Sequence, residues 1–160
     1  MTSQQPNLET VTETLSVTDH DDVIAVNYVE IIETVIDTLD QENTAMVSQN
    51  EEGYLWKFKY GSVEVFVKLT GLSDDDTFAV SSTVLQLPRQ NEPELLRKLL
   101  EMNCSETFEA HFGIFEEQVV VVSTRIVAEL SAGEISRAIT VVATIADDNN
   151  DKLQAEFAAA

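Results

Sequence analysis

Few residues of this chain have side chains that could act as a base, a nucleophile or a metal ligand near neutral pH. The only imidazoles are His20 and His111, and the only thiol is Cys104. If residues 107–114 form a strand, Glu109 and His111 share one of its faces, because side chains alternate along a strand. Such a pair could act as a base, but the sequence places no nucleophile or third ligand beside it. The pattern therefore favours a solvated strand face over a catalytic dyad.

The thiol and the acidic runs also favour structural interpretations. Cys104 is the sole cysteine, so no intramolecular disulfide can form. It follows a predicted helix, and because a helix C-terminus does not stabilise a thiolate, we expect a buried or inert thiol. The acidic runs at 74–76 and 147–151 lack the alternating acids, central glycine and distal glutamate of a calcium loop. We expect solvated loops there and no metal site.

Cofactor motifs are likewise missing from the sequence. The five glycines stand singly, which excludes a phosphate-binding loop and a dinucleotide-binding fingerprint. Ser131 precedes Glu134 by three residues, a spacing that predicts a helix cap rather than a nucleophile. We therefore expect no cofactor and no catalytic residues.

The charge of the chain restricts its partners. Nine Lys and Arg against 29 Asp and Glu give a net charge of −20. Nucleic-acid binding relies on cations that displace the counterions of phosphate, so the charge argues against nucleic acid and disfavours anionic membrane surfaces, and we expect neither as a partner. The chain shows neither an export signal nor a run of about 18 apolar residues, so we expect a cytoplasmic protein without a membrane span. The acidity mainly favours solubility and would steer basic partners to the surface.

The elements that must position these side chains follow from the spacing of apolar residues. Residues 1–22 are rich in Thr, Ser, Gln and acids and predict a disordered acidic tail, followed by a single domain at 23–157. Asn27 and Glu30 have the spacing of a capping box, and apolar residues then recur at a helical period as far as Leu39. The domain is expected to begin with this helix.

A two-residue period follows and predicts strands. Residues 54–60 and 63–69 alternate on either side of a Gly-Ser turn, and a further strand runs from Phe78 to Leu87, where Pro88 ends it. A short earlier strand at Met46 and Val47 is an additional possibility. These segments predict three or four neighbouring antiparallel strands.

The second half predicts a helix, two strands and a final helix. The middle helix begins near Pro93 and carries an apolar stripe as far as Leu100. Strands are expected at 107–114 and 119–130, and four consecutive valines in the latter favour a central strand that is buried on both faces. From Ser131 a long helix runs to Phe157, with a polar interruption at 147–151 that could kink or fray it, and nothing visible anchors the Ala-rich terminus. The predicted fold class is α+β: an N-terminal helix, an antiparallel sheet of about five to six strands interrupted by a short helix, and a long C-terminal helix.

This order of elements resembles the type III secretion chaperone-like fold of the YbjN-domain family. The resemblance covers residues 23–157 and is most specific over 85–134, which contains Leu87-Pro88, the Leu95 to Leu100 helix, Phe108, Phe112, the 119–129 strand and Ser131. It implies a compact sandwich without a cofactor, often a homodimer, whose secretion-chaperone relatives hold extended client segments against apolar surface. It supplies no catalytic residues.

The sequence also offers one candidate protein-binding surface. Four large aromatics share one predicted strand face: Tyr54, Trp56, Phe58 and Tyr60. They either pack in the core against the terminal helices or anchor a partner, since aromatics dominate both settings. Core packing is the favoured alternative, with Lys57, Lys59 and Lys68 on the opposite face.

Two functions of different classes follow from these observations. The first is a non-enzymatic protein-interaction module, chaperone-like or an adaptor, that forms a homodimer and binds an unknown protein partner through apolar surface. The alternative is a small-ligand or metal-binding regulatory domain that uses the acidic loops and His111. A hydrolase would require Glu109, His111 or Cys104 to converge with an oxyanion donor, and the sequence shows no such arrangement.

Overall fold

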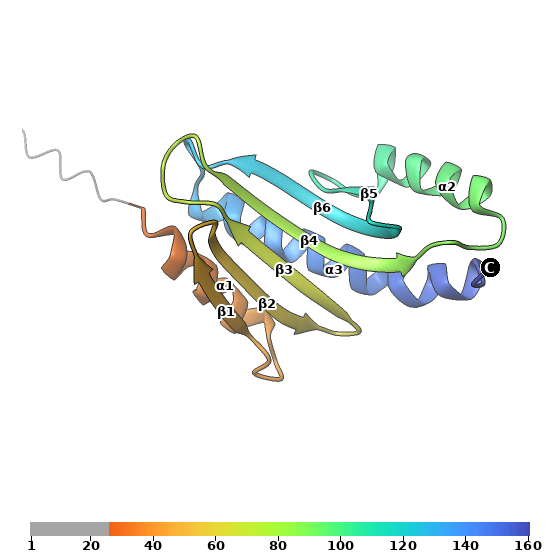
Figure 1. Ribbon diagram of the computed structural model, residues 1–160, viewed down its shortest axis with the longest axis horizontal. Helices are drawn as coiled ribbons and strands as arrows, with labels where there is room; N and C mark the ends of the chain where they lie inside the picture. Colours follow the sequence, from red (N-terminus) through yellow and green to blue (C-terminus); the bar gives the residue numbers. More distant parts are fainter. Residues whose placement is uncertain (1–25) are drawn as a thin grey trace, which may run out of the picture.

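The computed structural model describes residues 26–160 (Figure 1). The predicted tail at 1–22 and His20 lie outside these residues, and the boundaries of the 23–157 domain stay a prediction. In chain order the elements are α1 (Tyr28–Leu39), β1 (Met46–Asn50), β2 (Gly53–Tyr60), β3 (Val63–Leu69), β4 (Thr77–Gln86), α2 (Glu92–Ser105), β5 (His111–Phe115), β6 (Gln118–Ile126) and α3 (Ala132–Glu156).

The strands form one six-stranded antiparallel sheet in the order β1-β2-β3-β4-β6-β5. This arrangement confirms the predicted α+β class, including the short strand at Met46. β6 lies between β4 and β5, yet of its four consecutive valines Val119 and Val121 are buried, whereas Val120 and Val122 are partly exposed. The expectation of a strand buried on both faces is therefore wrong, because helices cover only one face of the sheet.

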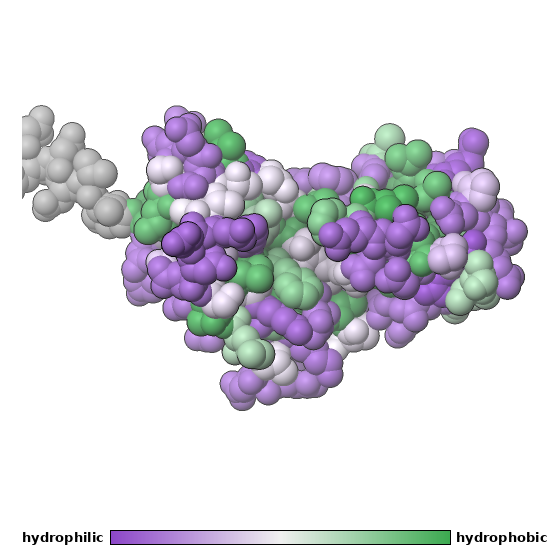
Figure 2. Space-filling view, viewed as in Figure 1, coloured by the Kyte–Doolittle hydropathy of each residue, from purple (hydrophilic) through white to green (hydrophobic). Residues whose placement is uncertain are grey.

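Both long helices lie on the same face of the sheet. Figure 1 shows the strands in front of α3, with α1 beside it. The core fills the space between these helices and the inward side chains of β2, β3, β4 and β6, and its largest buried members include Trp56, Phe78 and Ile139. The opposite face of the sheet, called the open face below, is the one seen in Figure 2. There green and white surface occupies the middle and purple surface surrounds it.

Local sequence explains where the two long helices begin and end. Glu30 donates its backbone N–H to the Asn27 side chain at 3.2 Å, and α1 then buries Ile32 and Ile36. α3 continues through the polar run at 147–151 without a break. The predicted kink is absent because apolar residues continue the buried stripe on both sides of that run.

The chain terminus is anchored, contrary to the sequence expectation. After α3, Gln90 donates its backbone N–H to the carbonyl of Ala158 at 2.9 Å, and Arg89 forms a β-bridge with Ala159. The Arg89 guanidinium also donates to the carbonyls of Gln86 and Phe157. Backbone pairing requires no particular side chain, so an Ala-rich segment can provide it without a sequence signal.

The segment between α2 and β5 differs most from its prediction. α2 extends through Ser105, and β5 begins only at His111, so the expected strand from Thr107 is wrong. Residues 107–110 form a turn instead, in which Phe108 has a φ of +53° and is 76% exposed. Apolar residues alternate from Phe108 to Ile114 as in a strand, but the first of these positions lie in a turn that changes the direction of the chain.

Candidate functional site

α2 carries two apolar rows that face different surroundings. Leu95, Leu99 and Met102 point inward and are buried. Leu96 and Leu100 form the second row, and Leu100 is 69% exposed. Of the two rows of leucines in the predicted apolar stripe, only one is buried in the core. A second apolar row on a surface helix is typical of an interaction surface.

A groove separates the outer row of α2 from the edge strand β5. It encloses about 310 Å³, and we call it the α2–β5 groove. Its lining is almost entirely apolar and consists of Leu96, Leu99, Leu100, Asn103, Phe112, Gly113 and Ile114. Figure 2 shows this region as green surface beside α2, bordered by purple charged residues. An apolar hollow with few polar groups is suited to holding the apolar side chains of another molecule.

Cys104 lies beside this groove rather than in the core. It belongs to the last turn of α2 and lines a shallow hollow with Leu96 and Leu100. Its side chain is exposed, so of the expected buried or inert thiol the burial is wrong, and its inertness stays a prediction. The error follows from the length of α2, because a longer helix places position 104 on the outer row.

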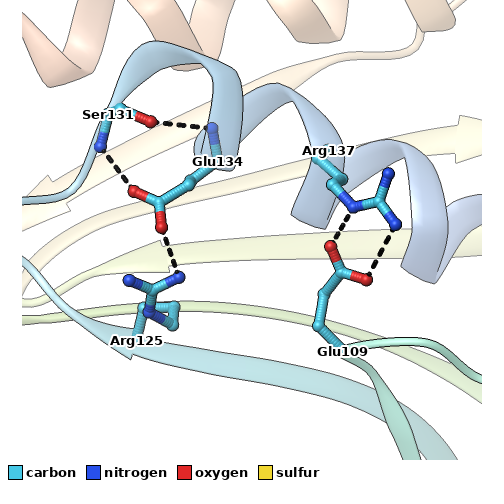
Figure 3. A network of polar contacts seen from close by, with 5 residues as sticks. All are labelled: Glu109, Arg125, Ser131, Glu134 and Arg137. Atoms are coloured by element: carbon cyan, nitrogen blue, oxygen red, sulfur yellow. Dashed lines mark hydrogen bonds and ion pairs between the residues drawn. The ribbon is translucent and has the colours of Figure 1, made fainter.

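Phe108 stands on the turn that leads from α2 to β5. The Arg137 guanidinium lies 5.9 Å from the centre of its ring, and the same guanidinium holds the Glu109 carboxylate in a bidentate pair (Figure 3). This hydrogen bond from Arg137 lowers the pKa of Glu109, and the pKa of Arg137 is raised in return. The pair ties the turn to α3, so an exposed aromatic ring is held in a defined place.

A second network in Figure 3 fixes the start of α3. Ser131 Oγ accepts from the backbone of Glu134 at 3.2 Å, and Glu134 Oε2 accepts from the Ser131 backbone at 2.9 Å. This confirms the predicted capping box. Arg125 donates to Glu134 Oε1 at 2.7 Å, and the hydrogen bonds from Ser131 and Arg125 lower the pKa of Glu134. Ser131 therefore acts as a cap, as the spacing predicted.

The residues proposed for catalysis do not converge. Glu109 faces Arg137 instead of His111, because β5 begins at His111 and the two do not share a strand face. His111 is exposed at the start of β5, while Cys104 lies on α2. Within residues 26–160, no group of three His, Cys, Asp or Glu side chains is arranged to hold a metal ion.

The two acidic runs each supply a carboxylate that organises a neighbouring segment. Asp76 accepts hydrogen bonds from the backbone and hydroxyl of Ser73 and from the hydroxyl of Thr70. Asp147 accepts from the backbone N–H and the hydroxyl of Ser62, both at 2.8 Å. Residues 147–151 belong to α3, so the expectation of a solvated loop is wrong for that run.

The predicted aromatic surface is divided between core and surface. Trp56 and Phe58 are buried, and the Trp56 indole donates to Glu33 of α1 at 3.2 Å. Tyr54 and Tyr60 are half-buried, and Tyr54 stacks on Trp56 with 5.5 Å between ring centres. The role of these four residues in partner binding stays a prediction. Only the two tyrosines have side-chain surface with which to contact another molecule.

Sequence reasoning missed the outer row of α2, Ile114 and Phe108 as surface residues. Their exposed positions follow from the direction in which α2 packs and from the turn at 107–110, and neither is encoded by a local motif. The available signal was the width of the leucine stripe on α2. Four leucines in six residues cover more of a helix than one buried face needs.

The antiparallel sheet, the helices on one of its faces and the apolar α2–β5 groove define a secretion chaperone-like α+β domain. The chain belongs to the YbjN family, whose model, described as "Putative bacterial sensory transduction regulator", matches residues 28–155. The match to this family model confirms the resemblance to the YbjN family that was inferred from the order of the elements.

The comparison with solved structures gives a distant likeness in fold. A chain in the crystal structure of the ExsC–ExsE complex is similar with a TM-score of 0.53 at 17% sequence identity, over 75% of this chain and 90% of that chain. No curated protein matches the sequence significantly. Among residues 26–160, no helix has the length and apolar character needed to cross a membrane.

Proposed function

We propose that this protein is a non-enzymatic interaction module, a chaperone-like protein or an adaptor, which binds segments of partner proteins in the α2–β5 groove. The observation that carries the proposal is the outer apolar row of α2, which faces Ile114 across the groove. Leu100 and Ile114 are large apolar side chains that the fold leaves exposed, although the core is complete without them. Their burial by a partner would supply the main favourable free energy of binding.

Two further observations support protein binding. The family description names a regulator, and the structure similar in fold is a complex of two proteins. Acidic residues lie close in the chain to the groove's lining residues, namely Glu101 and Glu106 on or next to α2 and Glu116 and Glu117 in the β5–β6 turn, and Glu101 is paired with Arg97. Together with the net charge of −20, they favour partner segments that combine apolar and basic residues.

The finer parts of the sequence prediction belong to the same proposal. The protein acts in the cytoplasm as a homodimer, needs no cofactor and binds neither nucleic acid nor membrane. The aromatic row at 54–60 contributes mainly by holding β2 against α1, with Tyr54 and Tyr60 available at the surface.

Affinity capture with a matched pair of variants tests the groove. Tagged wild-type protein captures its partner, which mass spectrometry identifies and which is then prepared in purified form. Leu100→Glu places a charge in the groove, while Leu72→Glu makes the same change at another exposed leucine, which is 57% exposed in the β3–β4 loop. We expect Leu100→Glu to weaken binding by at least about tenfold, because the variant loses the burial of a leucine side chain and has to bury a charged carboxylate instead.

The control decides between the groove and general acidity. Leu72→Glu is expected to bind as wild type, and both variants are expected to unfold at wild-type temperature because both positions are exposed. Equal losses in the two variants would assign the effect to charge, and full binding by Leu100→Glu would place the partner elsewhere.

A further inference from the structure

The two edges of the sheet differ in how their backbone groups are used. At the β5 edge, the Asn103 side chain pairs with both the N–H and the carbonyl of Phe112. α2 lies beside this edge (Figure 1). A further strand could therefore not pair along β5 without displacing Asn103.

The β1 edge has no comparable protection. The register with β2 and the two-residue turn after Asn50 direct the N–H and carbonyl groups of Val47 and Gln49 away from the sheet. Among residues 26–160 no hydrogen-bond partner is present for these groups, whereas the next outward N–H, that of Ala45, donates to Asp40 at 2.7 Å. Two residues of β1 thus offer a complete set of backbone donors and acceptors.

The side chains of β1 also leave this edge open to pairing. Every residue of β1 is exposed, and the strand contains no charge and no proline, the usual features that prevent edge-to-edge contact. Val47 lies on the helix side of the sheet and is 56% exposed, so α1 does not cover β1 there. The edge is accessible from both faces.

The cations beside this edge are already neutralised. Lys57 of β2 lies opposite Met46 of β1, and its ammonium pairs with Glu64 at 2.9 Å. Lys59 pairs with Glu42 at 3.2 Å. β1 and β2 contain no other Lys or Arg, so neither strand offers an unpaired cation to an acidic partner.

Carboxylates near the same edge lack such partners. Glu51 and Glu52 form the turn from β1 to β2, and Glu33 of α1 accepts the indole N–H of Trp56, the residue opposite Val47. Among residues 26–160 none of these three carboxylates takes part in an ion pair. The β1 edge therefore combines unpaired backbone groups with uncompensated negative charge, which complements a basic partner.

We propose that the β1 edge binds an extended basic segment of a partner protein as an additional strand of the sheet. The segment lies antiparallel to β1 and exchanges both backbone hydrogen bonds with Val47 and with Gln49. Its residues opposite these two point to the helix side, where a lysine or arginine beside Val47 pairs with the carboxylate of Glu33. Its alternate residues are apolar and lie on the open face beside Met46, which is 69% exposed.

The chain itself offers no suitable occupant for this edge. Residues 1–25 contain five acids and no Lys or Arg, and a second copy of β1 would bring the same uncompensated carboxylates to the contact. The β1 edge is also the opposite edge of the sheet from the α2–β5 groove. The inference therefore goes beyond the proposed function of that groove and does not depend on it.

Synthetic peptides test the backbone pairing without altering the protein. The probe is a short fluorescent peptide that alternates lysine with valine, and anisotropy measures its binding to the full chain. N-methylation of two lysine amides removes the N–H groups that face β1, whereas N-methylation of two valine amides affects only those that face solvent and keeps the same charge. We expect the first change to raise Kd about tenfold or more and the second to leave it near that of the unmodified peptide. Equal affinities of the two methylated peptides would assign binding to charge alone and overturn the proposal.

A matched pair of charge variants tests the position of the lysines. Glu33→Gln removes a negative charge and keeps an acceptor for the Trp56 indole, while Glu94→Gln makes the same change at an exposed position on α2. We expect Glu33→Gln to weaken peptide binding about two- to fivefold, as an exposed ion pair is lost, and Glu94→Gln to bind as wild type. Equal effects of the two substitutions would reject the placement of a cation beside Glu33.

Backbone variants of β1 separate this edge from other binding modes. Val47→Pro removes one outward donor and leaves the β1–β2 hydrogen bonds in place, while Val47→Thr keeps every backbone group. We expect Val47→Pro to raise Kd about fivefold or more and Val47→Thr to leave it near wild type. A peptide that Val47→Pro retains and Leu100→Glu releases would bind in the α2–β5 groove, which overturns this inference and keeps the proposed function. A wild-type dimer that becomes monomeric in Val47→Pro, as measured by sedimentation, would give the edge to a second copy and also overturn it.

Discussion

The side-chain amide of Asn103 pairs with both backbone groups of Phe112, accepting its N–H at 2.7 Å and donating to its carbonyl at 3.2 Å. α2 thus takes the place that another strand would occupy on the outer edge of β5. One side chain holds the wall of the α2–β5 groove in place and keeps the edge strand from pairing with other chains.

We expect Asn103→Ala to lower the free energy of unfolding by about 1–3 kcal/mol, because two backbone groups of a buried residue lose their partners. Urea unfolding followed by circular dichroism measures the change. Ser105→Ala is the control on the same helix, since its hydroxyl makes one long hydrogen bond to Glu101 at 3.4 Å and is exposed. A loss no greater than that of Ser105→Ala would show that water replaces the Asn103 amide.

We expect Trp56→Ala to cost about 3–5 kcal/mol of stability, because the buried indole fills the contact between β2 and α1 and donates to Glu33. Leu55→Ala is the matched change on the open face of the same strand and should stay within about 0.5 kcal/mol of wild type. Calorimetry measures both. Similar costs at the two positions would contradict the assignment of the aromatic face to the core.

These positions show which parts of the structure sequence reasoning could reach. Alternation in β2 and helical spacing in α1 are local patterns that report which side is buried, and they placed Trp56 and Ile32 correctly. The Ser131 cap was equally accessible, because three residues contain the whole interaction.

Long-range packing was beyond the reach of these patterns. The sequence suggested a strand through Phe108 because apolar residues alternate there, and only the packing of α2 against β5 requires a turn. The exposure of Leu100 has the same origin, since the position of α2 on the sheet decides which of its two leucine rows is covered.

We expect Gly61→Ala to destabilise the β2–β3 hairpin. Gly61 has a φ of +55°, and a Cβ there would overlap the Asp147 carboxylate that holds Ser62. Because Gly61→Ala and Asp147→Ala both break the same contact with Ser62, their combined cost should fall short of the sum of the single costs by about 0.5–3 kcal/mol. A double-mutant cycle from urea unfolding measures this coupling. Additive costs would mean that the alanine displaces something other than Asp147.

We expect the contribution of Asp76 to stability to depend on pH in a defined direction. The hydrogen bonds from Ser73 and Thr70 hold the pKa of Asp76 below its ordinary value of 3.8. A lowered folded-state pKa stabilises the protein above the unfolded value, and this contribution is lost as the pH falls through the folded-state pKa. The difference in unfolding free energy between wild type and Asp76→Asn should therefore be constant above about pH 5 and shrink below 3.8.

Asp75→Asn is the control for this titration, because among residues 26–160 its carboxylate makes no hydrogen bond or ion pair. Both variants remove one negative charge, so the general relief of repulsion cancels between them. A pH dependence that is the same in Asp75→Asn and Asp76→Asn would contradict a specific role for the Asp76 hydrogen bonds.

We expect Phe108→Asn to weaken partner binding without destabilising the fold. Phe108 holds a left-handed backbone conformation that suits asparagine far better than a bulky aromatic, so the substitution relieves local strain. The lost contact with Arg137 is exposed and worth about 0.5–1 kcal/mol, which the relief of strain offsets. An exposed aromatic that costs stability is best explained by what it contacts in a complex.

Phe115→Asn is the control, since Phe115 is also exposed at the end of β5 but does not have a positive φ. Thermal unfolding and titration with the captured partner are measured for both variants. The expected result is an unchanged or higher melting temperature with weaker binding for Phe108→Asn, and no gain in stability for Phe115→Asn. If Phe108→Asn binds the partner with full affinity, the ring does not contact the partner. If Phe108→Asn loses much stability, the contact of the ring with Arg137 outweighs the backbone strain.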